Sequence, residues 1–433
     1  MCIRDRPKGT IVWAIQQDHV KADLLFLGTE FGIYTSPNRG VNWFKLSGGV
    51  PTISFRDIKI HRRDNDLVGA SFGRGFYVLD DYSPLREITA TALAAEGAMF
   101  PVRDAWWFVP SQPGQAPGRP ESGSDDFTTA NPPMGALLTY YLKEAPTTAK
   151  EARQATEKTL REKGADTPFP GFDRLREEAL ESGPRVLLVI SDAAGRKVRW
   201  IEGPAKPGLH RVNWDLRGPS PDPLDLNPPA FRPPWAGSPV GPLAAPGRYS
   251  AELVVVSANG ARRVGTAQSF EVKPVSTAPS GTDFAGVAAF QQQTAELRRQ
   301  VAAAEERIGG VREQLRHMRA ALLQTPRANP DLFARMDSLA KGLAGLSVRL
   351  SGDPARGTLN ESDAPSISGR VGEVMGGHWE TRQTPTATQR RDIEIARSAL
   401  EGLTRDLKAL IEGDLARLKA DLESAGAPWT PGR

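Results

Sequence analysis

The residue types that most often bind metals or act as nucleophiles are sparse in this sequence. The one cysteine, Cys2, excludes a disulfide framework and a thiolate metal cluster. The five histidines stand far apart, and no two of them have the spacing of zinc ligands. These histidines are His19, His61, His210, His317 and His378. We therefore expect no metal site, no cofactor and no thiol nucleophile in this chain.

Two adjacent carboxylates, Asp80 and Asp81, are of the residue type that glycosidases use in pairs. The two carboxylates of a catalytic pair face each other across the sugar, about 5–10 Å apart. The side chains of neighbouring residues in a strand point to opposite faces of the sheet. We interpret these aspartates as turn or capping residues. The sequence also contains neither a Gly-x-Ser-x-Gly nucleophile elbow nor a phosphate-binding P-loop, so we assign no catalytic residue.

Composition narrows the class of protein. The 433 residues suggest about three domains. The 55 Lys and Arg nearly balance the 51 Asp and Glu, without the clustering that a nucleic-acid partner requires. No apolar stretch reaches the ~18–20 residues of a membrane span. The 42 Gly and 36 Pro indicate turn-rich β structure and linkers beside the packed cores.

Residues 23–34 and 66–77 repeat one another at an offset of 43 residues, with Asp, Leu, Gly and Tyr at matching positions. Each copy is typical of a short apolar strand, a glycine turn and a second strand with an aromatic residue. The offset lies within the ~40–50 residue period of four-stranded propeller blades. The sequence therefore predicts that residues 7–100 are the C-terminal blades of an incomplete β-propeller.

A turn motif lies between the two copies, at Ser36, Asn38, Gly40 and Trp43. Asn38 tolerates the left-handed backbone region and can bond its own backbone, and Gly40 adopts a positive φ without steric cost. Trp43 returns on the next strand, where its ring can be buried. We expect these four residues to be structural.

This motif resembles the Asp box of sialidase-type repeat propellers, with Asn38 in place of the usual Asp. Longer matches at 28–32, 55–58 and 74–81 resemble bacterial sortilin-like propeller proteins that are often named glycosyl hydrolases. The resemblance implies that the box is a folding element and that the protein is extracytoplasmic, either periplasmic or secreted. Because a ring needs about four to eight blades, we expect further blades upstream.

Two segments do not belong to any predicted domain. We interpret residues 1–6 as a non-native leader, because no apolar region or cleavage site of a signal peptide follows them. Residues 101–134 are rich in Pro, Gly and Ser in their second half and are predicted to be a linker.

Six strand-like runs predict a fibronectin/immunoglobulin-like β-sandwich over residues 135–275. Trp214 lies on the apolar face of one alternating run and is interpreted as a core residue. Two insertions interrupt the sandwich. Residues 147–182 are charged and helix-prone, and residues 219–246 are too rich in proline to pair as a central strand.

Residues 283–424 carry three heptad seams and predict an antiparallel helical bundle or coiled-coil tail. The first seam contains Gly309 and Gly310, which we expect to bend or split its helix. The third seam skips register after Leu410. We expect a loop at residues 376–386. The fold class is therefore multidomain, mainly β plus α: propeller blades, a β-sandwich and a helical bundle.

Three functions remain open at this point. The first is a non-catalytic extracytoplasmic scaffold that binds a protein, a peptide or a glycan. The second is a sialidase-like glycoside hydrolase, whose arginine triad, tyrosine and glutamate would lie in upstream blades. The third is an assembly module in which the tail at 283–424 mediates self-association or docks a partner.

Overall fold

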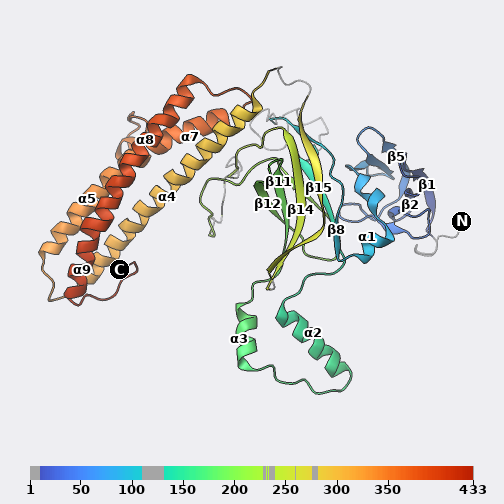
Figure 1. Ribbon diagram of the computed structural model, residues 1–433, viewed down its shortest axis with the longest axis horizontal. Helices are drawn as coiled ribbons and strands as arrows, with labels where there is room; N and C mark the ends of the chain where they lie inside the picture. Colours follow the sequence, from blue (N-terminus) through green and yellow to red (C-terminus); the bar gives the residue numbers. More distant parts are fainter. Residues whose placement is uncertain are drawn as a thin grey trace. The chain divides into compact units, whose positions relative to one another are not determined.

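The computed structural model describes residues 10–109, 131–227, 231, 233, 239–258, 260–275 and 281–432. The expected leader at 1–6 and most of the expected linker lie outside these residues. The chain divides into two compact units (Figure 1). The first comprises residues 1–108, 124–216 and 246–275, and the second comprises residues 109–123, 217–245 and 276–433. The first unit consists mainly of β-sheets and the second mainly of helices, which confirms a multidomain β plus α chain.

The first unit begins with two antiparallel meanders. One is a four-stranded sheet and the other a three-stranded sheet, each with its strands in chain order. The strands of the first are β1 (Val12–Gln17), β2 (Leu25–Thr29), β3 (Gly32–Ser36) and β4 (Phe44–Lys45). The strands of the second are β5 (Phe55–His61), β6 (Asp66–Ser71) and β7 (Phe76–Leu79). The two copies of the sequence repeat thus form the same hairpin, β2–β3 and β6–β7, in successive sheets.

The two meanders share one apolar core, because each strand presents alternate side chains to it. The buried members are Leu24, Phe26, Ile33, Phe55, Ile58, Leu67 and Tyr82. Phe55 lies unusually close to two glycines. A Cβ on Gly28 would come within 2.7 Å of the Phe55 carbonyl oxygen, and one on Gly69 within 2.9 Å of its ring. Glycine is therefore required at both positions for the sheets to approach.

Two further sheets in the first unit pack face to face. The three-stranded sheet has the order β13-β10-β8, and the five-stranded sheet has the order β12-β11-β14-β15-β9. Trp214 on β13 is fully buried and makes edge-to-face contacts with Tyr249 of β14 and Phe270 of β15. The expected core role of Trp214 is therefore confirmed. The strands are β8 (Gly97–Met99), β9 (Ala105–Trp107), β10 (Ala136–Leu142), β11 (Arg185–Asp192), β12 (Lys197–Gly203), β13 (Gly208–Trp214), β14 (Gly247–Ser257) and β15 (Gly260–Pro274).

The six predicted sandwich strands are all present, but the expected boundary at residues 100 and 101 is wrong. β8 lies in the segment assigned to the blades and pairs with β10. β9 lies in the segment assigned to the linker and pairs in parallel with β15. Each has only three residues, too few for a period-2 pattern to distinguish a strand from a turn.

The two insertions differ in their placement. Residues 147–182 form α2 (Ala149–Glu162) and α3 (Phe172–Leu180) in the first unit, as their helix-prone sequence predicts. Residues 217–245 belong to the second unit, so the expectation that 219–246 is an excursion of the sandwich is wrong. The Asp222 carboxylate accepts a hydrogen bond from Arg298 Nε at 2.8 Å, and this ion pair attaches the segment to a helix of the second unit.

The second unit is a helical bundle with one extended core cluster. Its helices are α4 (Phe284–Leu322), α5 (Asp331–Ser351), α6 (Pro354–Thr358), α7 (Ile367–His378), α8 (Ala387–Ala409) and α9 (Ala416–Ser424), with one π-helical segment η3 (Leu410–Leu415). The seam residues predicted on α4, α5 and α8 lie in this core, so they pack against one another within the chain. Thr386 caps α8 through a reciprocal capping box with Gln389.

Three features of the bundle differ from the sequence prediction. α4 continues through Gly309 and Gly310. The expected loop at 376–386 begins later, because α7 extends to His378. α7 also adds a fourth long helix to the three predicted. The expected register skip is confirmed, since η3 is a π-helical turn that absorbs one extra residue and returns Leu415 to the core.

Candidate functional site

The predicted Asp-box residues form a closed hydrogen-bonded turn between β3 and β4. Gly40 N donates to Ser36 Oγ at 2.8 Å, and Ser36 Oγ donates to Asn38 Oδ1 at 3.1 Å. Asn38 Oδ1 also accepts from the backbone N–H of Asn42 at 2.9 Å. Trp43 Nε1 donates to the Gly40 carbonyl at 3.0 Å, and its buried ring packs with Leu27 and Tyr34. The arrangement holds the turn and presents no reactive group.

One detail of this turn differs from expectation. Gly40 has the expected positive φ of 86°, but the left-handed residue before it is Arg39, with a φ of 58°. Asn38 instead uses its side chain to cap the turn. Arg39 is held there by a backbone hydrogen bond to the Asp23 carbonyl at 2.9 Å and by an ion pair with the Asp23 carboxylate.

Asp81 has the expected role in a turn, but neither aspartate is the N-cap of the short helix that follows, since that N-cap is Tyr82. The Asp81 carboxylate is buried and accepts from the Ser83 hydroxyl at 2.5 Å at the start of the short helix η1 (Ser83–Glu87). The backbone carbonyls of Asp80 and Asp81 accept hydrogen bonds from Arg211 on β13 at 2.6 and 2.8 Å. Burial, together with the charge of Asp66, raises the pKa of Asp80. These contacts connect the end of the second meander to β13 within the first unit.

The structure brings one histidine close to two carboxylates, a grouping that the sequence analysis did not predict. His61 Nδ1 lies 3.2 Å from Asp64 and 3.7 Å from Asp66, at the β5–β6 turn. A nitrogen and two carboxylate oxygens within 4.8 Å of one another are suitable donors for a divalent ion. Both carboxylates already have cationic partners, since Arg63 contacts Asp64 at 2.8 Å and Arg103 contacts Asp66 at 3.9 Å. The cluster is therefore charge-compensated by the protein itself.

A second polar cluster that sequence reasoning missed surrounds Asp18, which is 4% exposed. The Tyr82 hydroxyl donates to Asp18 Oδ1 at 2.6 Å. Arg86 Nε donates to Asp18 Oδ2 at 2.7 Å, and Arg86 Nη2 donates to Asp18 Oδ1 at 2.8 Å. Burial raises the pKa of Asp18, but the hydrogen bonds from Arg86, Tyr82 and the Lys21 backbone outweigh it and hold the pKa far below its usual range. With its carboxylate oxygens bonded internally, Asp18 is a structural anion.

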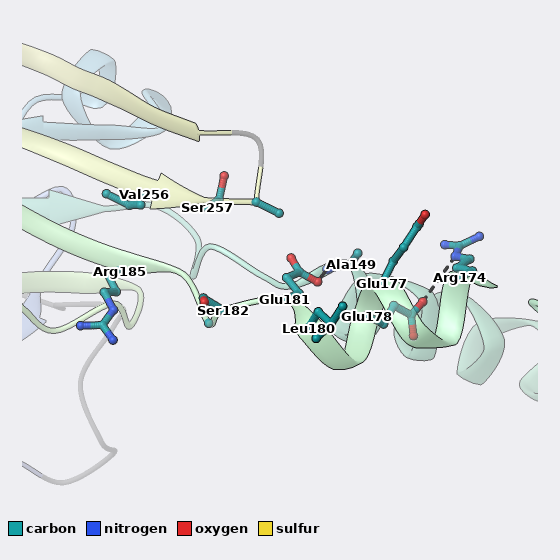
Figure 2. A pocket seen from close by; sticks show the side chains of 12 residues that line it. Ala149, Arg174, Glu177, Glu178, Leu180, Glu181, Ser182, Arg185, Val256 and Ser257 are labelled. Atoms are coloured by element: carbon teal, nitrogen blue, oxygen red, sulfur yellow. Dashed lines mark hydrogen bonds and ion pairs between the residues drawn. The ribbon is translucent and has the colours of Figure 1, made fainter. Parts of the chain in front are cut away.

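A cleft of about 760 Å³ lies between α3 and the adjacent ends of β11 and β14 (Figure 2). Glu178, on its α3 wall, is ion-paired with Arg174 at 3.3 Å and with Arg153 at 2.7 Å. The hydrogen bond from Arg153 lowers the pKa of Glu178. Glu181 accepts from the backbone N–H of Ala149 at 2.8 Å. These two carboxylates therefore hold the α2–α3 hairpin, which leaves Glu177 as the one acidic side chain without an ion pair or hydrogen bond among the described residues that line the cleft.

An exposed cluster of different character lies on the two meanders. The Arg56 guanidinium carbon is 3.5 Å from the centroid of the Trp13 ring and 5.0 Å from that of Phe72. Trp13 Nε1 donates to the Glu30 carboxylate at 2.8 Å, which fixes the orientation of the indole. Trp13 is 40% exposed and Phe72 is 69% exposed. We refer to Trp13, Arg56 and Phe72 as the aromatic–arginine cluster.

The charge of Arg56 has no carboxylate beside it. Within the described residues Arg56 forms no ion pair, whereas Arg39, Arg63 and Arg86 each have a carboxylate partner. A guanidinium held between two rings keeps its N–H donors in the plane between them, available to an external acceptor. No local pattern predicts this site, because Trp13, Arg56 and Phe72 lie in three different segments of the chain.

Comparisons with known proteins give no assignment. No family model and no curated protein matches this chain. CopC from Methylosinus trichosporium OB3b is 14% identical to this chain, with a TM-score of 0.16. The match covers 35% of this chain and 86% of the CopC chain. The extracellular domain of the putative one component system BT4673 from B. thetaiotaomicron is 9% identical, with a TM-score of 0.14, and the match spans 61% of this chain and only 25% of that domain. Likenesses this weak support no argument about fold or function.

None of the described helices is both long enough and apolar enough to cross a bilayer.

Proposed function

We propose that this chain is a non-catalytic, extracytoplasmic scaffold that binds a protein, peptide or glycan ligand. In this proposal the two meanders are β-propeller blades, and the two stacked sheets form a fibronectin/immunoglobulin-like sandwich. The repeated hairpins β2–β3 and β6–β7, their shared core and the closed Asp-box turn support the blades. The extracytoplasmic location rests on the family resemblance of the sequence.

The observation that carries the binding role is the unpaired Arg56 guanidinium between Trp13 and Phe72. A guanidinium whose position is fixed loses little conformational entropy when it binds, and its planar donors match a carboxylate or another oxyanion. Exposed aromatic rings beside it supply apolar contact area. We therefore propose that the ligand has an anionic group that is bound by the aromatic–arginine cluster.

Hydrolysis has weaker support than binding. Of the acidic residues that line the cleft beside α3, Glu178 is engaged in ion pairs and Glu181 in a hydrogen bond from the backbone N–H of Ala149, which leaves Glu177 as a single acidic side chain without such a contact among the described residues. Asp18 and Asp81 are buried. A glycosidase needs an acid and a base that both reach the sugar. Neither the cleft glutamates nor the two buried aspartates form such a pair.

The proposal is tested by calorimetric titration of the full chain with matched probes. The probes are a peptide rich in Asp and Glu, its Asn and Gln counterpart, an oligogalacturonide and a neutral galactose oligomer. We expect one acidic probe to bind, with an affinity that falls at least tenfold in Arg56→Gln and decreases with salt. Arg62→Gln, an exposed arginine on the β5–β6 turn, is the control and should bind as wild type. Equal binding by Arg56→Gln, or no binding of any acidic probe, contradicts the proposal.

A further inference from the structure

Among the described residues, no strand pairs with the outer edge of β7, although the equivalent edge in the first meander is covered. At the offset of 43 residues, Phe76 and Val78 of β7 correspond to Ile33 and Thr35 of β3. There β4 pairs with β3, and the Leu46 N–H donates to the Ile33 carbonyl at 2.9 Å. After β7 the chain continues into η1 instead of a fourth strand. The second sheet is therefore one strand narrower than the first.

The backbone groups of Phe76 and Val78 point away from the sheet. The Ser71 N–H donates to the Gly75 carbonyl at 3.0 Å and closes the β6–β7 hairpin. Because the direction of these groups alternates along an antiparallel strand, those of Tyr77 face β6, whereas those of Phe76 and Val78 face the open edge. Within the described part of the chain, no protein group bonds to them outside the β6–β7 ladder. The edge therefore offers N–H donors and carbonyl acceptors to another strand.

β7 also lacks the features that usually protect a free edge. Charged residues, proline, a bulge or a very short strand prevent one sheet from adding to another. The edge strand β12 carries Lys197 and Arg199, and the edge strand β4 has only two residues. β7 has the uncharged sequence Phe-Tyr-Val-Leu and keeps a regular register with β6. Phe76 is 77% exposed and Val78 is 55% exposed, so apolar side chains accompany the free backbone groups.

The two ends of β7 carry opposite charges. Arg74 precedes the strand and is exposed, and Asp80 follows it and is half-buried. Among the described residues, neither side chain forms an ion pair. When two identical strands pair in antiparallel orientation, the start of each lies beside the end of the other. A second β7 therefore brings each Arg74 to an Asp80, and this complementarity favours a second copy of the chain over an unrelated strand.

We propose that two copies of this chain pair through β7, antiparallel and about a two-fold axis at Tyr77, so that their three-stranded sheets become one continuous sheet. In this register Phe76 exchanges backbone hydrogen bonds with Val78 of the partner subunit. Arg74 then lies opposite Asp80 of the partner subunit. The backbone groups and the charges thus select the same register. An aromatic side chain opposite a β-branched one is also a favourable cross-strand pair.

The contact is small compared with the interfaces of stable dimers, since it involves only residues 74–80 of each copy. We therefore expect a dimer that dissociates on dilution. It is distinct from self-association through the tail at 283–424, whose seam residues are already buried against one another within one chain. The inference concerns β7 alone and does not depend on the proposed binding of an anionic ligand.

Sedimentation velocity of the full chain, over about a hundredfold range of concentration, tests the proposal. The wild type is expected to shift from monomer to dimer as the concentration rises. Val78→Lys adds a charge to the edge at an exposed position and should weaken the dimer by about tenfold or more. Val41→Lys is the matched control, at a position that is 72% exposed on the Asp-box turn, and should associate as the wild type does.

Two outcomes of this experiment would overturn the proposal. A wild type that stays monomeric would leave the edge to a strand of a different protein. A dimer that Val78→Lys does not weaken would place the interface elsewhere, for example on the helical tail.

A pair of charge-exchange variants tests the register. In Arg74→Glu and in Asp80→Lys, each homodimer places like charges opposite one another, so each variant alone should associate less than the wild type. In a mixture of the two variants, both facing pairs are opposite in charge, and a heterodimer should form. A mixture that associates no better than its separate components overturns the proposal. If Asp80→Lys does not fold, the comparison of Val78→Lys with Val41→Lys still decides.

Discussion

The guanidinium of Arg86 donates two hydrogen bonds, 2.7 and 2.8 Å long, to the carboxylate of Asp18, although the two residues are 68 positions apart. Asp18 follows β1 in the first meander, and Arg86 lies in η1 after the second. The same guanidinium donates to Asn65 Oδ1 at 2.6 Å, in the β5–β6 turn. Arg86 therefore connects the β1–β2 turn of the first meander to the β5–β6 turn of the second.

Replacing the buried Asp18 carboxylate should destabilise both meanders. We expect Asp18→Asn to lower the free energy of unfolding of this region by about 3–5 kcal/mol, because it leaves the Arg86 charge without its partner. The control is Asp23→Asn, which breaks an exposed ion pair with Arg39 and should cost less than about 1 kcal/mol. Hydrogen exchange of the β-strands in the full chain measures both. Equal effects of the two substitutions would contradict this assignment.

The contribution of the Asp18 carboxylate to the free energy of unfolding should be lost in acid. Its pKa is lower in the folded than in the unfolded protein, so the unfolded chain binds the proton more readily. The stabilisation is complete above the unfolded pKa of about 3.9 and is lost as pH falls below it. The difference in stability between wild type and Asp18→Asn should therefore shrink in acid and stay constant near neutrality.

Substitutions at Asn38 should separate the role of its side-chain oxygen as a hydrogen-bond acceptor from the role of its side-chain nitrogen as a donor. Asn38→Ala removes the acceptor used by Asn42 N–H and Ser36 Oγ, and we expect a loss of about 1–3 kcal/mol. Asn38→Asp keeps that acceptor and should change stability by less than about 1 kcal/mol, provided that the Asn42 amide turns its nitrogen toward the new carboxylate. Thermal unfolding followed by tryptophan fluorescence compares them. A larger loss in Asn38→Asp than in Asn38→Ala would contradict this account.

The π-turn in η3 should tolerate the removal of one residue. Deleting Gly413 removes the extra residue between Leu407 and Leu415 and allows α8 to continue into α9 as a regular α-helix. We expect the bundle to fold with unchanged or slightly higher stability in urea. Deleting Ala399 instead rotates the following seam residues away from the core and should unfold the C-terminal half of the bundle. Similar losses in both deletions would show that η3 does not compensate the register.

The helical unit should lose stability when His378 is protonated. Burial lowers the pKa of His378, so between that pKa and the unfolded value of about 6.5 the unfolded chain binds the proton and the folded chain does not. Stability is therefore constant above about pH 6.5 and falls below it. His378→Gln should reduce this slope, whereas His317→Gln, at an exposed position, should retain it. Hydrogen exchange of α4 and α7 across this range is the measurement.

Patterns that repeat over many residues predicted the fold well. The offset between residues 23–34 and 66–77 predicted two equal hairpins, and the skip after Leu410 predicted the position of the π-turn. Periodicity failed where an element was too short to show a period, as in β8 and β9. It also could not show that the proline-rich insertion contacts α4, because the ion pair between Asp222 and Arg298 joins two residues that are 76 positions apart.

The candidate sites were less predictable than the fold. Trp13, Arg56 and Phe72 come from different strands and turns, so their proximity arises only from the pairing of the two meanders. Asp18 and Arg86 are similarly remote in sequence. His61, Asp64 and Asp66 are near one another in the chain, and their clustering could have been anticipated from a tight turn between two strands. Side-chain chemistry that depends on tertiary contacts is not encoded in local spacing.

The participation of β8 and β9 in the stacked sheets determines where the chain can be cut. A fragment excised from residue 135 onward would leave both short strands behind, uncovering the backbone edge of β10 in one layer and of β15 in the other. Such a piece is expected to aggregate on expression. A soluble fragment that contains both stacked sheets therefore has to start ahead of Gly97, and cutting there also separates Arg211 from the Asp80 and Asp81 carbonyls that it binds.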